Sequence, residues 1–136
     1  MIKKNNFKMN KKIILGSDHA GFELKEEIKK FLTQLEYEYE DLGTNSKESC
    51  DYPKIAFEVA KKVAETDSRG ILICGSGLGD TIVANKVKGI RAANCFSEYT
   101  AKMSREHNNS NVLCLGARIL SKNQAKNITK IFLETA

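Results

Sequence analysis

The sequence contains no apolar run long enough to cross a membrane. A membrane-spanning helix needs about 20 consecutive apolar residues, and no such run occurs in this chain of 136 residues. The first twelve residues, MIKKNNFKMNKK, also lack the apolar core of a secretory signal. We therefore expect a cytoplasmic protein without membrane contact. Residues 1–11 are interpreted as a flexible leader, with Met9 a second candidate for the start.

The cysteines and histidines lack the spacing of a disulfide framework or a metal centre. The four cysteines are far apart and form no C-x-x-C pair, and two of them fall in strands expected to be buried. They are Cys50, Cys74, Cys95 and Cys114. His19 and His107 form neither an H-x-x-x-H nor an H-E-x-x-H pair. We therefore expect free thiols, no cofactor and a reaction that needs no metal.

Repeats, low-complexity stretches and interdomain linkers are also missing, which favours a single domain over residues 12–136. The hydrophobic content of 41% is sufficient for a buried core. The formal net charge of +5 suggests nucleic acid at first sight. However, Lys3, Lys4, Lys11 and Lys12 lie in the leader and the rest is nearly balanced. The sequence therefore gives no indication of nucleic-acid binding.

Apolar strand-like runs alternate with amphipathic helical patterns along the whole chain. The expected strands cover residues 13–16, 37–42, 70–74, 90–96 and 111–116. The expected helices cover about 24–35, 53–63, 80–87, 97–106 and 121–134. This alternation predicts an α/β fold, a three-layer, doubly wound, Rossmann-like parallel sheet of five strands. Its ligand site is expected beyond the carboxyl ends of the strands, where the strand order reverses.

The segment RGILICGSGLGDTIVANK is the most informative part of the chain. A short apolar strand leads into Cys74, three glycines at alternate positions and a new helix. Such a turn brings backbone N–H groups and a helix N-terminus close to a phosphate or a developing oxyanion. A thiol at this place can have a lowered pKa and act as a base or nucleophile. The glycines fit neither the dinucleotide G-x-G-x-x-G pattern nor a P-loop.

Further polar residues follow the other strands, and each also has a purely structural explanation. Asp18 can cap a helix, His107 can interact with a helix C-terminus, and Arg118 can be a solvated charge. Cys74 can simply fill space at a strand end. Their joint occurrence near strand ends is harder to explain by packing alone. The collection suits a small phosphorylated ligand.

Five separated motifs carry a resemblance to a known family. They are GSDHAGFELK, ESCDYP, GILICGSGLG, ANKVKGIRAA and SREHNNSNVLCLGAR. From about Lys12 to its end the chain resembles the type B ribose-5-phosphate isomerases. The resemblance implies metal-free interconversion of D-ribose 5-phosphate and D-ribulose 5-phosphate through an enediolate, in the pentose phosphate pathway. It also implies a homodimer or homotetramer with sites between subunits.

The resemblance implies a role for each matching residue. Cys74 would be the base that moves a proton between C1 and C2, and His107 would assist ring opening. Ser76 and loop N–H groups would stabilise the enediolate oxygen; these groups belong to Gly75, Gly77, Leu78 and Gly79. The contacts to sugar hydroxyls or phosphate would come from Asp18, His19, Tyr52, Asn108 and Arg118.

Two features depart from the family pattern. Some relatives lack the cysteine and use a carboxylate directly after the third glycine, and this chain has both Cys74 and Asp80. We favour Cys74 as the base because Asp80 is also a favourable charge in the first turn of a helix. The family usually continues into a basic Gly-Gly-Arg-His segment, whereas this sequence stops at Ala136. Weaker phosphate binding is therefore expected.

Two other functions remain open at this stage. The same enediol chemistry serves a six-carbon aldose phosphate such as allose or galactose 6-phosphate, although galactose-type relatives lack the Asp-His and Cys-Gly motifs. A non-catalytic phosphate- or nucleotide-binding module could use the same architecture. Simple binding, however, does not require the combination of Cys74, Ser76 and His107.

Overall fold

The protein folds into a three-layer α/β sandwich, as the sequence predicts. The computed structural model describes residues 12–43 and 52–136; the leader, Met9 and Cys50 lie outside these ranges. Five parallel strands form one sheet in the order β2-β1-β3-β5-β4. The strands are β1 (Ile13–Ser17), β2 (Tyr39–Asp41), β3 (Arg69–Cys74), β4 (Ala92–Asn94) and β5 (Val112–Gly116). The helices are α2 (Phe22–Gln34), α3 (Tyr52–Thr66), α4 (Leu78–Ala84), α5 (Glu98–Glu106) and α6 (Lys122–Glu134).

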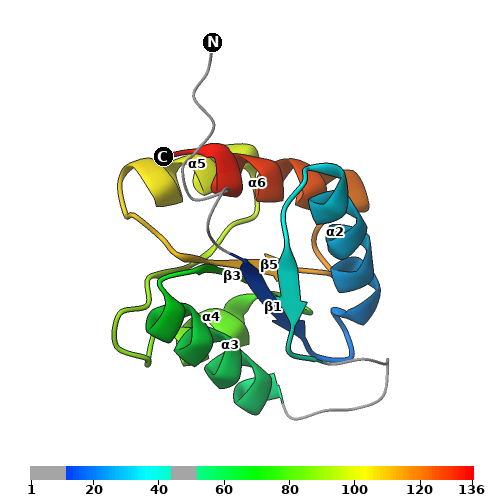
Figure 1. The fold of residues 1–136 in the computed structure, drawn as a ribbon. Helices are drawn as coiled ribbons and strands as arrows, with labels where there is room; N and C mark the ends of the chain where they lie inside the picture. Colours follow the sequence, from blue (N-terminus) through cyan, green and yellow to red (C-terminus); the bar gives the residue numbers. More distant parts are fainter. Residues whose placement is uncertain (1–11, 44–51) are drawn as a thin grey trace.

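Helices cover both faces of the sheet, with α2, α5 and α6 on one side and α3 and α4 on the other (Figure 1). Every residue of β1, β3 and β5 is buried. Their side chains alternate between two apolar clusters. Ile71 and Ile73 pack toward α2 and α6, whereas Leu72 packs toward α3. Among the described helices, none has the length and apolar character needed to cross a bilayer.

The two edge strands are shorter than the sequence suggests. The run 37–42 yields only β2, and the run 90–96 yields only β4. Each edge strand pairs with a single neighbour, so its ends have fewer ladder hydrogen bonds to extend it. The helix expected over 80–87 instead covers Leu78–Ala84. It ends where the Asn85 amide exchanges two hydrogen bonds with the backbone of Ala92, at 2.8 and 3.0 Å.

The strand order brings three loops together at the carboxyl edge of the sheet. The order reverses between β1 and β3, and β5 lies on the other side of β3. Asp18 N–H donates to the Ile73 carbonyl at 3.3 Å, and Ala117 N–H donates to the Cys74 carbonyl at 2.8 Å. Arg118 N–H donates to the Gly75 carbonyl at 2.9 Å. The loops after β1, β3 and β5 therefore form one surface.

A buried ion pair ties α2 to the end of β2. Lys25 is fully buried, and its Nζ donates to both carboxylate oxygens of Asp41, at 2.9 and 2.8 Å. Gly43 N–H donates to the same carboxylate at 2.9 Å, and the Gly43 carbonyl accepts from Ser17 N–H at 2.7 Å. Burial raises the pKa of Asp41, but donors from Lys25, Gly43 and Lys29 outweigh it and lower the pKa overall. This chain of contacts ends beside Asp18.

Removing the carboxylate of Asp41 should therefore destabilise the fold. We expect Asp41→Ala to lower the free energy of unfolding by about 3–5 kcal/mol, because the buried Lys25 ammonium loses its two hydrogen bonds to this carboxylate. Since folding lowers the pKa of Asp41, its stabilisation is present above about pH 4 and is lost as the pH falls further. Urea unfolding at pH 7 and pH 3 measures both effects.

Glu40→Ala is the matched control for this experiment. Glu40 pairs at 3.3 Å with Lys62, whose side chain is 41% exposed. An exposed pair contributes less than about 1 kcal/mol. Equal losses for the two variants would contradict a special role for the buried pair.

Candidate active site

The loop after β3 turns sharply because glycines allow two close backbone contacts. Gly77 has φ +88°, and a Cβ there would lie 2.5 Å from Asn94 Oδ1. A Cβ on Gly116, at the end of β5, would lie 2.6 Å from the Ser76 carbonyl oxygen. Side chains at either place would push the loop away from its neighbours. The glycines therefore hold Cys74 and Ser76 at the carboxyl edge of the sheet.

The N–H groups at the start of α4 point toward the loop rather than into the helix. Gly77 N–H donates to Cys74 Sγ at 3.1 Å, and Asp80 N–H also donates to this sulfur. Leu78 N–H donates to Ser76 Oγ at 3.1 Å. The first N–H groups of a helix lack partners inside it. The N–H groups of Gly77 and Leu78, which were expected to face a ligand, thus already donate to acceptors within the loop.

The Cys74 thiol differs from the expectation of a lowered pKa. The pKa of Cys74 is raised to about 11, first by burial and then by the negative charge of Asp80, against the opposing effect of the N–H groups of Asp80 and Gly77. The side chain is only 6% exposed. Withdrawal from water and a neighbouring carboxylate thus outweigh the helix N-terminus. The proton stays on sulfur near neutral pH.

Asp80 is the nearest group that can accept this proton. It is 2% exposed, and its Oδ2 has no hydrogen-bond partner among the described residues. The pKa of Asp80 is raised to about 7, mainly by burial; a hydrogen bond with Cys74 opposes this shift, and the charge of Asp18 adds to it. The thiol and the carboxylate form a buried pair whose proton can move from one to the other. This arrangement suits proton transfer near neutral pH.

A pocket of about 350 Å³ opens above this pair. Its lining residues are Asp18, Cys74, Gly75, Ser76, Gly79, Arg118 and Ile119. The Arg118 guanidinium packs over Gly75, where an added Cβ would lie 3.1 Å from Nη1. Asp18 Oδ1 accepts from Gly21 N–H at 2.9 Å, which fixes the turn that follows β1. The pocket therefore places one cation beside the Cys74 thiol.

Most of the site residues predicted for these three loops do lie together. His19 is exposed and lines an adjoining pocket of about 420 Å³ between the first turns of α2 and α6. Ile119 also lines the main pocket, and the sequence motifs did not predict it. An apolar residue beside Arg118 in a polar loop could have indicated this position. Tyr52 opens α3, and its side chain lies outside the described residues.

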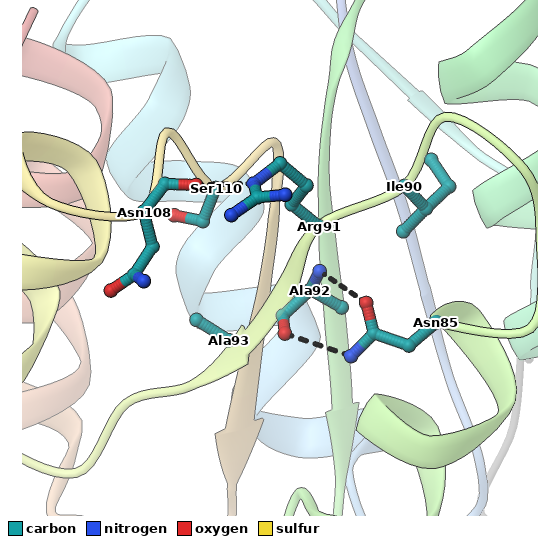
Figure 2. Close-up of a pocket in the computed structure, with 7 residues that line it drawn as sticks. All are labelled: Asn85, Ile90, Arg91, Ala92, Ala93, Asn108 and Ser110. Atoms are coloured by element: carbon teal, nitrogen blue, oxygen red, sulfur yellow. Dashed lines mark hydrogen bonds between the residues drawn. The ribbon is translucent and has the colours of Figure 1, made fainter.

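His107 and Asn108 do not join the pocket within one chain. They follow α5 and precede β5, so they lie at the amino edge of the sheet, whereas Cys74 lies at the carboxyl edge. A strand of five residues spans about 17 Å. Asn108 instead lines a separate pocket of about 400 Å³, shown in Figure 2 with Asn85 and Arg91. No single side chain bridges the two edges.

Within the described ranges, no group of three or more His, Cys, Asp or Glu residues is arranged to hold a metal ion. The described cysteines Cys74, Cys95 and Cys114 are free and buried. The groups that can do chemistry at the carboxyl edge include the Cys74 thiol, two carboxylates, the His19 imidazole, a hydroxyl and a guanidinium.

Comparison with known proteins identifies the family. The model of the ribose/galactose isomerase family matches residues 13–136. The chain belongs to this family. Ribose-5-phosphate isomerase B of Escherichia coli is 49% identical over 125 residues, which are 90% of this chain and 83% of that protein. The ribose/galactose isomerase motifs seen in the sequence thus reflect a relationship along nearly the whole chain.

Solved structures of family members also match the fold. Ribose-5-phosphate isomerase B of Clostridium thermocellum superimposes with a TM-score of 0.89 at 50% identity, covering 91% of this chain and 84% of that one. The Mycoplasma genitalium ribose-5-phosphate isomerase B, solved with bound ribulose-5-phosphate, gives a TM-score of 0.89 at 42% identity. That match covers 93% of this chain and 85% of the other. The doubly wound sheet is thus the ribose/galactose isomerase fold.

The buried carboxyl group of Asp80 should reduce stability at alkaline pH. Because folding raises its pKa from about 4 to about 7, stability is lost as the pH rises through this interval. We expect Asp80→Asn to be roughly 2–4 kcal/mol more stable than the unmutated chain at pH 8, with a smaller gain at pH 5. Urea unfolding at both pH values measures the difference.

Glu98→Gln serves as control, because Glu98 is an exposed acid in the first turn of α5. It should leave stability nearly unchanged at both pH values. A gain for Asp80→Asn that is the same at pH 5 and pH 8 would contradict a raised pKa of the buried carboxyl group.

Proposed function

We propose that this chain interconverts D-ribose 5-phosphate and D-ribulose 5-phosphate as a type B ribose-5-phosphate isomerase. The observation that carries this proposal is the buried thiol–carboxylate pair of Cys74 and Asp80 beneath a pocket edged by Arg118. Its support includes the names of the relatives in Escherichia coli and Clostridium thermocellum and the ribulose-5-phosphate bound to the Mycoplasma genitalium protein.

The reaction moves one proton between adjacent carbons. The Cys74 thiolate takes the proton from C2 of the open-chain aldose, and the electron pair of that bond forms the C1–C2 double bond as negative charge moves to O1. The sulfur then returns the proton to C1, while the O2 hydroxyl proton moves to O1 and leaves the ketone. Before this, the thiol proton passes to Asp80, whose carboxylate contacts it.

The loops supply the remaining interactions. Ser76 Oγ and the N–H of Gly79 line the pocket and can donate to the enediolate oxygen, which places fixed dipoles where charge develops. The Arg118 guanidinium is suited to binding two phosphate oxygens at once. His19 adds a second donor on the same side, and Asp18 is placed to accept from a sugar hydroxyl. Each of these roles is part of the proposal.

We also propose that a second copy of the chain completes the site with its His107 and Asn108. These residues lie at the opposite sheet edge from Cys74, so His107 is too far away to open the ring of a sugar held beside the Cys74 of its own chain. Exposed apolar side chains near the pocket offer a surface for the second copy. They are Leu78, Ile82 and Ile119, each at least 60% exposed. A homodimer or homotetramer follows from this arrangement.

A non-catalytic binding module is a weaker explanation of the site. A buried carboxyl group with one oxygen lacking a described partner costs free energy, and the hydrogen bond with Cys74 offsets this only in part, since the pKa of Asp80 remains raised. Binding a phosphate needs neither group. A functional demand for proton transfer explains why both are present. A six-carbon aldose phosphate would use the same pair, so two such sugars are tested as substrates.

The first test is turnover of ribose 5-phosphate to ribulose 5-phosphate in the presence of chelator. We expect the unmutated chain to be active and Cys74→Ala to lose about 10²–10⁴-fold in kcat, the usual contribution of a general base. Cys95→Ala is the control, because Cys95 is an equally buried free thiol away from the pocket. Activity that survives Cys74→Ala would move the base to another group.

Allose 6-phosphate and galactose 6-phosphate in the same assay test the substrate. Higher kcat/KM on either would assign the six-carbon reaction. No turnover of any of the three sugars would leave only the binding function.

The pH dependence separates the two groups of the pair. We expect kcat/KM to rise with pH along an acidic limb near pH 7, because the Asp80 carboxyl must be ionised to receive the thiol proton. Asp80→Asn should remove this limb and lower the plateau, whereas Asp18→Asn should keep the limb and shift it to a lower pH, because the charge of Asp18 raises the pKa of Asp80. A limb that persists at the same pH in Asp80→Asn would contradict the role of this carboxylate.

A further inference from the structure

The short loop from His107 to Asn111, between α5 and β5, is held from two sides by arginines. On the α5 side, Arg105 Nη1 donates to Asn109 Oδ1 at 3.2 Å and also to the Ser110 carbonyl. Asn109 has φ +48°, a left-handed conformation that asparagine adopts more readily than most residues. The backbone of the loop is thus fixed at its centre.

On the other side, Arg91 holds the first half of the loop. Arg91 Nε donates to the Asn108 carbonyl at 2.5 Å, and Arg91 N–H donates to Asn111 Oδ1 at 2.8 Å. Asn111 N–H donates back to the Arg91 carbonyl at 2.9 Å, and its Nδ2 donates to the Gly89 carbonyl at 2.9 Å. In Figure 2 the Arg91 side chain extends from the strand side of the pocket toward Asn108.

These hydrogen bonds fix the loop backbone and do not involve the side chains of His107 and Asn108. The side chains of His107 and Asn108 are exposed, and the described hydrogen bonds from arginine side chains to this loop go to carbonyls or to Asn109. A loop that served only to connect α5 with β5 would not need a charged donor on the Asn108 carbonyl. A loop that presents side chains to another molecule needs a backbone fixed in this way.

Arg91 and Arg105 differ in their surroundings. Arg105 is 8% exposed, and its Nε also donates to the Thr135 carbonyl beyond α6, so it joins several elements of the fold. Arg91 is exposed, and the one hydrogen bond described for its guanidinium goes to Asn108. Replacing Arg91 therefore changes the loop with little effect on the core.

We propose that Arg91 is a positioning residue that acts in trans: it orients His107 and Asn108 of its own chain for the site of a second copy. This inference rests on the proposed function, in which one chain supplies Cys74 and the other His107. Fixing the Asn108 carbonyl fixes the peptide plane that joins the two residues, and hence the direction in which the imidazole leaves the backbone. A displacement of about 1 Å at a reacting group can lower a rate about 100-fold.

Hybrid oligomers test the proposal with ribose 5-phosphate as substrate. A chain carrying Cys74→Ala and a differently tagged chain carrying His107→Ala are co-expressed and the hybrid is purified through both tags. One of its sites then receives Cys74 from one chain and His107 from the other, so activity should return. Arg91→Ala is then added to one chain or to the other.

We expect opposite results from the two placements. On the Cys74→Ala chain, which supplies the working His107, Arg91→Ala should lower kcat about 10–100-fold. On the His107→Ala chain, whose loop serves only a site already inactivated by Cys74→Ala, it should change kcat less than twofold. Arg91→Lys should recover only part of the loss, since lysine lacks the planar guanidinium. Lys88→Ala, an exposed cation in the same segment, is the control.

Three results would overturn the proposal, and they differ from one another. Equal effects of Arg91→Ala in both placements would show a general structural role, which melting temperatures of the variants would also register. No effect in either placement would show that the loop does not depend on Arg91. An inactive hybrid made from chains whose unmutated form is active would refute the shared site, whereas an inactive unmutated chain would refute the isomerase function itself.

Discussion

The pairing of β3 with β1 on one side and β5 on the other is the constraint on which the rest of the structure depends. All three strands are buried on both faces, so their register is set by apolar side chains that alternate between two helical layers. Because the strands are parallel, their carboxyl ends meet at one edge. The loops that follow are then fixed by backbone hydrogen bonds to the neighbouring strand, and Cys74 and Arg118 have little freedom to separate.

The electrostatics of the pocket follow from how deeply these loops are packed. A helix N-terminus favours negative charge by about 0.3–1 kcal/mol in most exposed settings. Burial of a thiol or carboxyl group can shift its pKa by several units, each unit corresponding to ~1.4 kcal/mol. Burial therefore prevails over the start of α4, and the pKa values of Cys74 and Asp80 both rise. Two acidic groups that resist ionisation together can share one proton, which is more useful to an isomerase than a permanently charged thiolate would be.

The central part of this fold could be predicted from the sequence because it depends on local signals. Continuous apolar runs predicted β1, β3 and β5, and the glycines after Cys74 predicted the turn. The order of β4 and β5 could not be predicted from local signals. It depends on which strand pairs with β3, and no short segment of the sequence determines that pairing. The pKa of Cys74 was missed for a similar reason: the carboxylate that raises it is recognisable in sequence, but the burial of both groups is a property of the packed loops.

The position of His107 likewise depends on the packed structure and not on a local sequence signal, and its consequence concerns two chains. Sequence patterns placed it near a helix end, and the topology puts that end at the amino edge of the sheet, where the polar groups of the other loops cannot meet it. If His107 acts at the carboxyl edge, as proposed, it therefore does so in the site of a second copy. Before the two chains associate, no pocket holds this imidazole in its orientation. If it became ordered only on association, the conformational entropy lost would oppose binding. Hydrogen bonds from Arg91 and Arg105 to the loop backbone order it in advance. Two arginines at an edge far from Cys74 thus belong to the proposed shared site, because a histidine that acts in a second copy requires the rigidity that they confer on its loop.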